Sequence, residues 1–120
     1  MVLKMSVYAR TEFVAFHQWP NAPIEYKYLS YPHRHEFHVE VSVWVSQENR
    51  QVEFHKLKRD TDDEIKNLYQ FELSNAKPIH ASCEAIAMAI GGALRDRHNY
   101  RVVHVDVSED GECGGRVEYE

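Results

Sequence analysis

The residues from His33 to Ser46 alternate between two kinds of side chain, and this alternation restricts the possible folds more than any other feature of the chain. One row is apolar and consists of Phe37, Val39, Val41, Val43 and Val45. The row between them is mostly polar and consists of His38, Glu40, Ser42, Trp44 and Ser46. Because successive side chains of a strand point to opposite faces, the pattern predicts a strand in a sheet that is buried on one face. His33 and His35 continue the apolar row.

The segments before and after this strand predict the remaining elements. Residues 6–17 alternate more loosely and predict a first strand, with His17 on its apolar side together with Val7, Ala9, Phe13 and Ala15. Residues 18–32 contain three prolines and scattered aromatic residues, which is typical of a long loop. Residues 101–109 predict a third strand, whose inner row is Val103, Val105, Val107 and Glu109. A glycine-rich turn then leads to a short last strand at residues 116–120.

Two helices are predicted in the middle of the chain. The first has a strongly acidic outer face and an apolar stripe at spacings of three and four, made of Phe54, Leu57, Thr61, Ile65 and Leu68. Alternatively, Thr61 and Glu64 form a capping box, and the helix begins there. The second helix begins after Ser82 and ends at Asn99, with a stripe made of Ile86, Ile90, Ala93 and Leu94.

The order β-β-α-α-β-β predicts an α+β fold in which two helices cover one face of an antiparallel sheet. A chain of 120 residues corresponds to one domain, residues 1–120. The net charge of −5 argues against a nucleic-acid partner. Because no apolar run has the length of a membrane span or a signal peptide, we expect no membrane association and a cytoplasmic location. Two cysteines are too few for a disulfide framework, and we expect Cys83 and Cys113 to be free thiols.

Three of the eight histidines have the spacing of metal ligands. His33 and His35 leave one face of a strand roughly 7 Å apart, and His17 ends the neighbouring strand on the same side. Three imidazoles and an open position are the ligand set of a catalytic zinc ion. Alternatively, these are strand-end side chains whose hydrogen bonds go to the backbone or to water. The other histidines are expected to be surface or packing residues, with His80 the one closest to a predicted helix start.

Two glutamates lie at informative positions. Glu109 ends the third strand on the valine face, where a carboxylate is costly unless a ligand with paired N–H groups donates hydrogen bonds to it. Alternatively, it lies beyond the strand end in solvent. Glu84 lies in the first turn of the second helix, where the helix dipole alone explains a carboxylate.

The order of these motifs resembles the 6-pyruvoyl-tetrahydropterin synthase and 6-carboxytetrahydropterin synthase family over nearly the whole chain. FVAFH (13–17) is similar to the family strand F-x-A-x-H, and HRHEF (33–37) to H-G-H-N-Y. VEFHKLK (52–58) is similar to V-x-D-F-x-x-L-K, and ASCEAIA (81–87) to P-T-x-E-x-x-A. VDVSE (105–109), with the closing glycines and YE, is similar to V-x-V-x-E-T and the segment after it.

The resemblance implies a tunnelling fold, in which β-β-α-α-β-β subunits assemble into a closed barrel, usually a hexamer of two trimers with active sites between subunits. It also implies that His17, His33 and His35 bind Zn²⁺. The implied substrate is the reduced pterin 7,8-dihydroneopterin triphosphate, which Glu109 and Glu84 would contact. The implied chemistry is loss of triphosphate with an internal redox shift, eased by zinc-bound side-chain hydroxyls.

The chain departs from the family at the residues that move protons. The family's cysteine before the H-G-H motif is missing from residues 26–32, and Glu25 is the only acidic residue in this loop that could replace it. The family's Asp and His in L-D-H-x-x-L-N correspond to Tyr69 and Gln70, which cannot replace a carboxylate and an imidazole near neutral pH.

Three hypotheses follow. In the first, the chain is a zinc-dependent lyase with a reassigned base such as Glu25. In the second, it keeps the zinc and the pterin-binding glutamate but has lost the synthase reaction, and it serves as a binding protein or catalyses a different step on a related purine-like compound. In the third, it is a structural oligomer whose histidines bind metal weakly or not at all. The retained ligands and the missing bases predict that the standard reaction is slow or absent.

Overall fold

The computed structural model describes residues 3–47 and 50–120, which form one antiparallel sheet and the helices that pack on it. The sheet has the strand order β1-β2-β3-β4, with every neighbouring pair antiparallel. Its strands are β1 (Met5–His17), β2 (His33–Val45), β3 (Val102–Glu109) and β4 (Cys113–Glu118). The helices are the 3₁₀ helix η1 (Ile24–Ser30) and α1 (Phe54–Leu68), α2 (Gln70–Asn75) and α3 (Cys83–His98).

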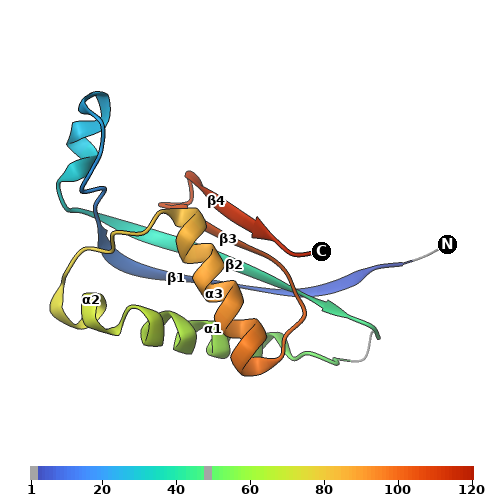
Figure 1. Cartoon of the computed structure of the whole chain (residues 1–120). Helices are drawn as coiled ribbons and strands as arrows, with labels where there is room; N and C mark the ends of the chain where they lie inside the picture. Colours follow the sequence, from blue (N-terminus) through green and yellow to red (C-terminus); the bar gives the residue numbers. More distant parts are fainter. Residues whose placement is uncertain (1–2, 48–49) are drawn as a thin grey trace.

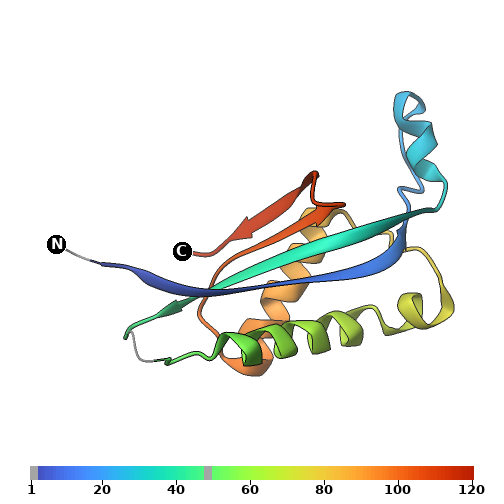
Figure 2. The same cartoon turned by 180° about the vertical axis from the view of Figure 1, so that it is seen from behind.

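The helices α1 and α3 lie on one face of the sheet, which confirms the predicted α+β layers (Figure 1). The view from behind shows the other face of the sheet without a covering helix, and we call it the open face (Figure 2). The core lies between the valine rows of β2 and β3 and the two helices; its fully buried members include Val41, Val105, Leu57, Ile86, Ile90 and Leu94. Within the described ranges, no helix has both the length and the apolar character of a membrane span.

The helix α1 begins at Phe54, and the Glu53 carboxylate accepts a hydrogen bond from the backbone N–H of Lys56. The alternative start at Thr61 is wrong, because the Thr61 hydroxyl donates to the Leu57 carbonyl from within the helix. Phe54 is 54% exposed, although the sequence places it in the apolar stripe.

Glu64 of α1 is a second difference from the sequence prediction, because it is buried although the outer face of the helix was expected to carry the acidic residues. Its carboxylate lies 3.1 Å from Nε2 of His98 and 3.6 Å from the Arg97 guanidinium, so the charge is compensated by α3.

The predicted ends of α3 are confirmed. The Ser82 hydroxyl accepts from the backbone N–H of Ala85 at the beginning, and Asn99 ends the helix in the left-handed conformation with φ of 58°. Gly91 lies where a methyl group would collide with the Tyr119 hydroxyl, so this glycine allows the C-terminal segment to pack closely on the helix.

Two details of the last strands differ from the sequence prediction. The register between β2 and β3 shifts between Ser42 and Val43, so that Val102 is buried in place of Val103. The turn consists of Asp110, Gly111 and Glu112, while Gly114 lies inside β4. A methyl group on Gly114 would lie 2.0 Å from the Val107 carbonyl oxygen, so the two strands approach too closely there for any other residue.

Two short helices were also not predicted. The loop expected at residues 18–32 contains η1 and stands away from the sheet as an arm (Figure 1), and we call these residues the arm. The helix α2 follows α1 directly after Tyr69, which is itself buried.

Burial of α3 against the sheet predicts a large loss of stability for I90A. Ile90 is fully buried, and truncation of such a side chain costs about 2–5 kcal/mol through lost transfer energy and the remaining cavity. Met88 lies on the exposed side of the same helix, and M88A is expected to change the free energy of unfolding by less than about 0.5 kcal/mol. Urea denaturation followed by circular dichroism measures both, and equal losses would contradict the assigned packing.

Candidate functional site

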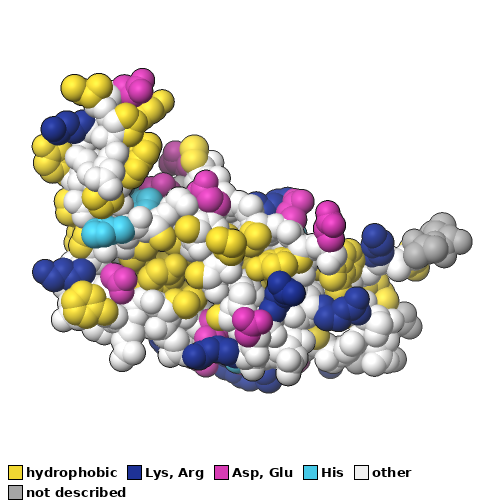
Figure 3. All heavy atoms as spheres, in the orientation of Figure 1, with side chains coloured by type: hydrophobic (Ala, Val, Ile, Leu, Met, Phe, Trp, Pro, Cys, Tyr) yellow, Lys and Arg dark blue, Asp and Glu magenta, His cyan; other side chains and the backbone are white. Residues whose placement is uncertain are grey.

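Four titratable side chains meet where β1 ends, β2 begins and β3 ends. The antiparallel register places His17 opposite His33 and Phe37 opposite Glu109. His35 follows two residues after His33 and therefore leaves the same face of the sheet. Histidine side chains gather at the base of the arm in the space-filling view (Figure 3). We call His17, His33 and His35 the histidine cluster.

The three rings of the histidine cluster are in contact with one another. Their centroids are 5.6 Å apart for His17 and His33, 6.4 Å for His17 and His35, and 4.7 Å for His33 and His35. The buried Phe37 ring closes one side, with its centroid 5.4 Å from that of His17. All three histidines are partly buried, so the cluster has an apolar side and remains open to solvent.

Backbone carbonyls fix the tautomers of two histidines. Nε2 of His17 is 2.6 Å from the Ala81 carbonyl oxygen, and Nδ1 of His33 is 2.8 Å from the Tyr31 carbonyl oxygen. Because a carbonyl oxygen only accepts, each of these nitrogens carries the proton. The other nitrogen of each neutral ring, Nδ1 of His17 and Nε2 of His33, therefore has a free lone pair.

His35 lies between two carboxylates. Its Nδ1 is 2.7 Å from Oδ2 of Asp110, and its Nε2 is 2.6 Å from Oε2 of Glu109. The Asp110 carboxylate also accepts from the backbone N–H of Glu36, and this bond, together with His35, holds the pKa of Asp110 below its usual range. Asp110 is therefore ionised near neutral pH and fixes the orientation of the His35 ring.

The ligand atoms of His17, His33 and Glu109 all lie within 4.8 Å of one another. Oε2 of Glu109 is 3.7 Å from Nδ1 of His17, which is the nitrogen with the free lone pair. His35 joins this group through the same oxygen of Glu109. Imidazole nitrogens with a carboxylate are donors that suit zinc and similar transition metals, so the residues fit a metal ion.

The segment before α3 is bonded to the end of β1 and positions His17. Residues His17 and Ile79 form a parallel bridge, in which the Ile79 N–H donates to the Phe16 carbonyl and the Gln18 N–H donates to the Ile79 carbonyl. His80 lies beside this bridge, with its Nε2 3.0 Å from the Gln18 side-chain oxygen. His80 is therefore near the histidine cluster but bonded to the base of the arm.

Cys83 is a buried thiol close to the two predicted substrate contacts. Burial raises its pKa to about 11, and the charges of Glu109 and Glu84 add to the rise. Cys83 is therefore protonated near neutral pH, contrary to the lowered pKa that a helix start can produce. Glu84 itself is exposed, and its pKa is lowered by its own backbone N–H and by the Ser82 hydroxyl.

Three further positions, Glu25, Tyr69 and Gln70, were predicted to stand where proton-moving residues would be needed. Glu25 is an exposed residue of η1, and among the described residues no hydrogen bond or ion pair joins it to the three histidines. Tyr69 is buried at the end of α1, where burial, with a contribution from Glu72, raises its pKa to about 12. Gln70 is exposed at the beginning of α2.

Sequence reasoning missed Asp110 and the carbonyls of Tyr31 and Ala81. The signal for Asp110 is its position directly after Glu109, at the turn that returns beside Glu36 and His35. The two carbonyls carry no signal in the sequence, because any residue supplies one.

Comparisons with known proteins confirm the fold. The sequence profile of the family described as 6-pyruvoyl tetrahydropterin synthase matches residues 6–120. An uncharacterised protein from Wolinella succinogenes is similar in structure with a TM-score of 0.72 at 14% identity, covering 99% of this chain and 100% of that one. A 6-pyruvoyl tetrahydropterin synthase from Caenorhabditis elegans has a TM-score of 0.65 at 10% identity, covering 98% of this chain and 97% of that one. A sequence search of curated proteins found no match.

The two free thiols are expected to differ in reactivity. Cys113 is exposed, whereas Cys83 is buried and its pKa is about 11, so Cys83 holds little of the reactive thiolate near neutral pH. In the native protein at neutral pH, the rate at which iodoacetamide modifies Cys83 should be at least about tenfold lower than the rate for Cys113. Peptide mass spectrometry measures both rates, and C113S should abolish the fast phase. Equal rates in the folded protein would contradict the burial of Cys83.

Proposed function

The chain belongs to the 6-pyruvoyl tetrahydropterin synthase family, and on this premise we propose that it binds zinc at the histidine cluster and a reduced pterin at Glu109, with slow or absent synthase turnover. The observation that carries the proposal is that ligand atoms of His17, His33 and Glu109 converge from three strand ends, with Nε2 of His35 2.6 Å from the same Glu109 oxygen. The hydrogen bonds of the outer ring nitrogens leave one nitrogen of each histidine directed toward the others or toward Glu109.

The zinc ligands in this proposal are Nδ1 of His17, Nε2 of His33 and Nε2 of His35. The partners on the opposite nitrogens are Ala81, Tyr31 and Asp110, and such partners orient a metal-binding imidazole. When bound, zinc would polarise the side-chain hydroxyls of the pterin and make them more acidic. The chain's own part is to hold the three rings in place.

Glu109 is the proposed pterin contact, because a carboxylate accepts two parallel hydrogen bonds from the ring N–H and amino group of a pterin. Its Oε2 is engaged with Nε2 of His35, the nitrogen that we assign to zinc. A zinc ion on Nε2 of His35 would take the place of this proton and would leave the Glu109 carboxylate free to accept from a pterin. Glu84, exposed at the beginning of α3, is the second proposed contact.

The weak turnover follows from the state of the candidate bases. Tyr69 and Cys83 both have raised pKa values, about 12 and about 11, and keep their protons near neutral pH. Glu25 belongs to the exposed arm, where its carboxylate is not bonded to the histidine cluster. Proton abstraction needs a base within hydrogen-bond reach of the substrate, so the protonated Tyr69 and Cys83 and the unbonded Glu25 support slow turnover.

We also propose that copies of the chain assemble into a trimer or a hexamer. The strands β1 and β4 are the edges of the four-stranded sheet, and β1 is 13 residues long. The arm presents apolar side chains, of which Ile24 is 90% exposed. Light scattering after gel filtration should give a mass of three or six chains, and a monomer at micromolar concentration would contradict this assembly.

Incubation of the zinc-loaded protein with 7,8-dihydroneopterin triphosphate tests the function. Mass spectrometry should show pterin binding with little release of triphosphate. E109Q should weaken binding roughly 10–100-fold, because it removes a charged acceptor, whereas E112Q in the neighbouring turn should not. Binding that is equal in wild type and E109Q would contradict the pterin contact. Rapid release of triphosphate would contradict the proposal that the chain lacks a working base. E25Q and H80Q would then test whether Glu25 or His80 is that base.

Zinc affinity should depend on Asp110 even though Asp110 is not a ligand. D110N loses the charged acceptor of Nδ1 of His35, and such a change lowers metal affinity roughly 10–100-fold. H35A should lose the ion of the histidine cluster, and E112Q serves as the matched control from the same turn. Competition with a chelator measures the affinities. If H35A binds as many zinc ions per chain as wild type, the assignment of the ligands is wrong.

A further inference from the structure

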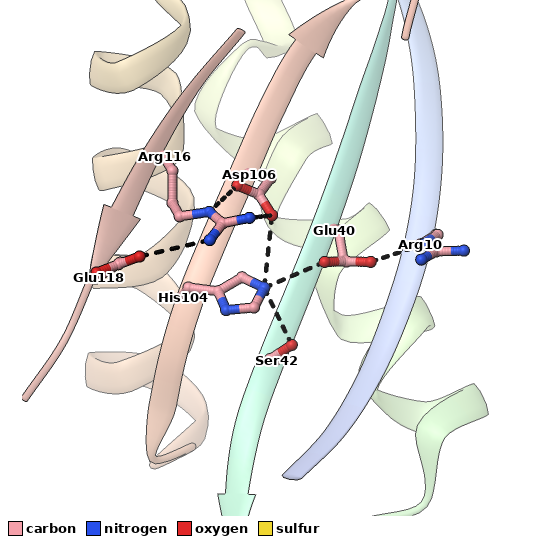
Figure 4. A network of polar contacts seen from close by, with 7 residues as sticks. All are labelled: Arg10, Glu40, Ser42, His104, Asp106, Arg116 and Glu118. Atoms are coloured by element: carbon pink, nitrogen blue, oxygen red, sulfur yellow. Dashed lines mark hydrogen bonds and ion pairs between the residues drawn. The ribbon is translucent and has the colours of Figure 1, made fainter.

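A second cluster of metal-ligating side chains lies on the open face of the sheet (Figure 4). Glu40 of β2 and His104 and Asp106 of β3 have ligand atoms that all lie within 4.8 Å of one another. Sequence reasoning placed His104 among the surface or packing histidines, because its partners come from a neighbouring strand. We call Glu40, His104 and Asp106 the open-face cluster.

The atoms of the open-face cluster converge on one nitrogen. Nε2 of His104 is 3.1 Å from Oε2 of Glu40 and 3.5 Å from Oδ2 of Asp106. A third oxygen, the Ser42 hydroxyl, is 3.2 Å from the same nitrogen. Four ligands at about 2.05 Å around a tetrahedral metal ion lie about 3.3 Å from one another, so the separations from Nε2 of His104 are compatible with a shared coordination shell.

Arginines hold the carboxylates from the other side (Figure 4). Nε of Arg10 is 2.7 Å from Oε1 of Glu40, and Nε of Arg116 donates to Oδ1 of Asp106. These bonds turn Oε2 and Oδ2 toward His104, and ligating carboxylates commonly have such partners. Nη2 of Arg116 is also 3.2 Å from Oδ2 of Asp106, but Glu118 offers that guanidinium another acceptor at 3.4 Å.

The three side chains of the open-face cluster are partly exposed. The side chains of Glu40, His104 and Asp106 are 24%, 21% and 28% exposed, so solvent and dissolved ions reach all three. One imidazole and two carboxylates are a donor set for zinc and its neighbours in the first transition row.

We infer that Glu40, His104 and Asp106 form a second divalent transition-metal site, separate from the histidine cluster. The site connects β2 to β3 at Ser42 and His104, the last pair before the register shifts. An ion there would join the two strands where their ladder of hydrogen bonds is interrupted. The inference does not depend on the proposed pterin chemistry.

Metal analysis of the full chain after equilibrium with Zn²⁺ and removal of unbound metal tests the inference. H104Q should hold one zinc ion fewer per chain than wild type, and H35A should also hold one fewer, because each loses a different site. H55Q, which changes an exposed histidine of α1, should equal wild type. E40Q should weaken the site at least tenfold, and it provides a second test if H104Q does not fold.

The outcomes separate the two sites. If H104Q and E40Q fold and bind as much zinc as wild type with the same affinity, the inference is wrong. The open-face cluster is then held together by hydrogen bonds and ion pairs alone. If H104Q loses one ion but H35A loses none, the open-face site stands and the zinc site of the proposed function is wrong. A further expected result is that zinc raises the unfolding temperature of H104Q less than that of wild type.

Discussion

The antiparallel pairing of β1 with β2 is the constraint on which the site depends. It places His17 opposite His33, and it places Phe37 where its ring closes the space beside His17. A shift by one residue would turn the histidines to the open face together with the valines, so burial of the valine row and formation of the site require the same register. The core of the sheet therefore keeps the histidine cluster in place, although the cluster lies at the end of the sheet.

The sequence predicts the parts of the fold that have a regular period. The alternation in β2 identifies the row that includes His33 and His35, and the spacing of Ile86, Ile90 and Leu94 identifies the buried side of α3. The alternation of side chains does not predict the register shift between Ser42 and Val43, because this shift depends on how β3 pairs with β2. For the same reason Val103 was predicted in the place that Val102 occupies.

At the site, the sequence predicts which side chains meet but not how each is held. The predicted strand ends and their order in the chain suffice to predict that His17, the two histidines of β2 and Glu109 lie near one another. The tautomers of the rings depend on carbonyls from Tyr31 and Ala81, which come from the arm and from the segment before α3. Folding of the arm and docking of that segment thus orient the rings of His17 and His33, even though neither belongs to the sheet.

The strand β2 contributes residues to both clusters, and the two clusters lie on opposite faces of the sheet. His33 and His35 leave β2 on the side of the helices, and Glu40 leaves it on the open face, because positions of opposite parity point in opposite directions. The fully buried Phe37 and Val39 lie between the two positions in the chain. Electrostatic coupling between the clusters has to cross this packed layer or run along the strand. A substitution in one cluster is therefore expected to leave the geometry of the other intact, provided that the valine row stays buried.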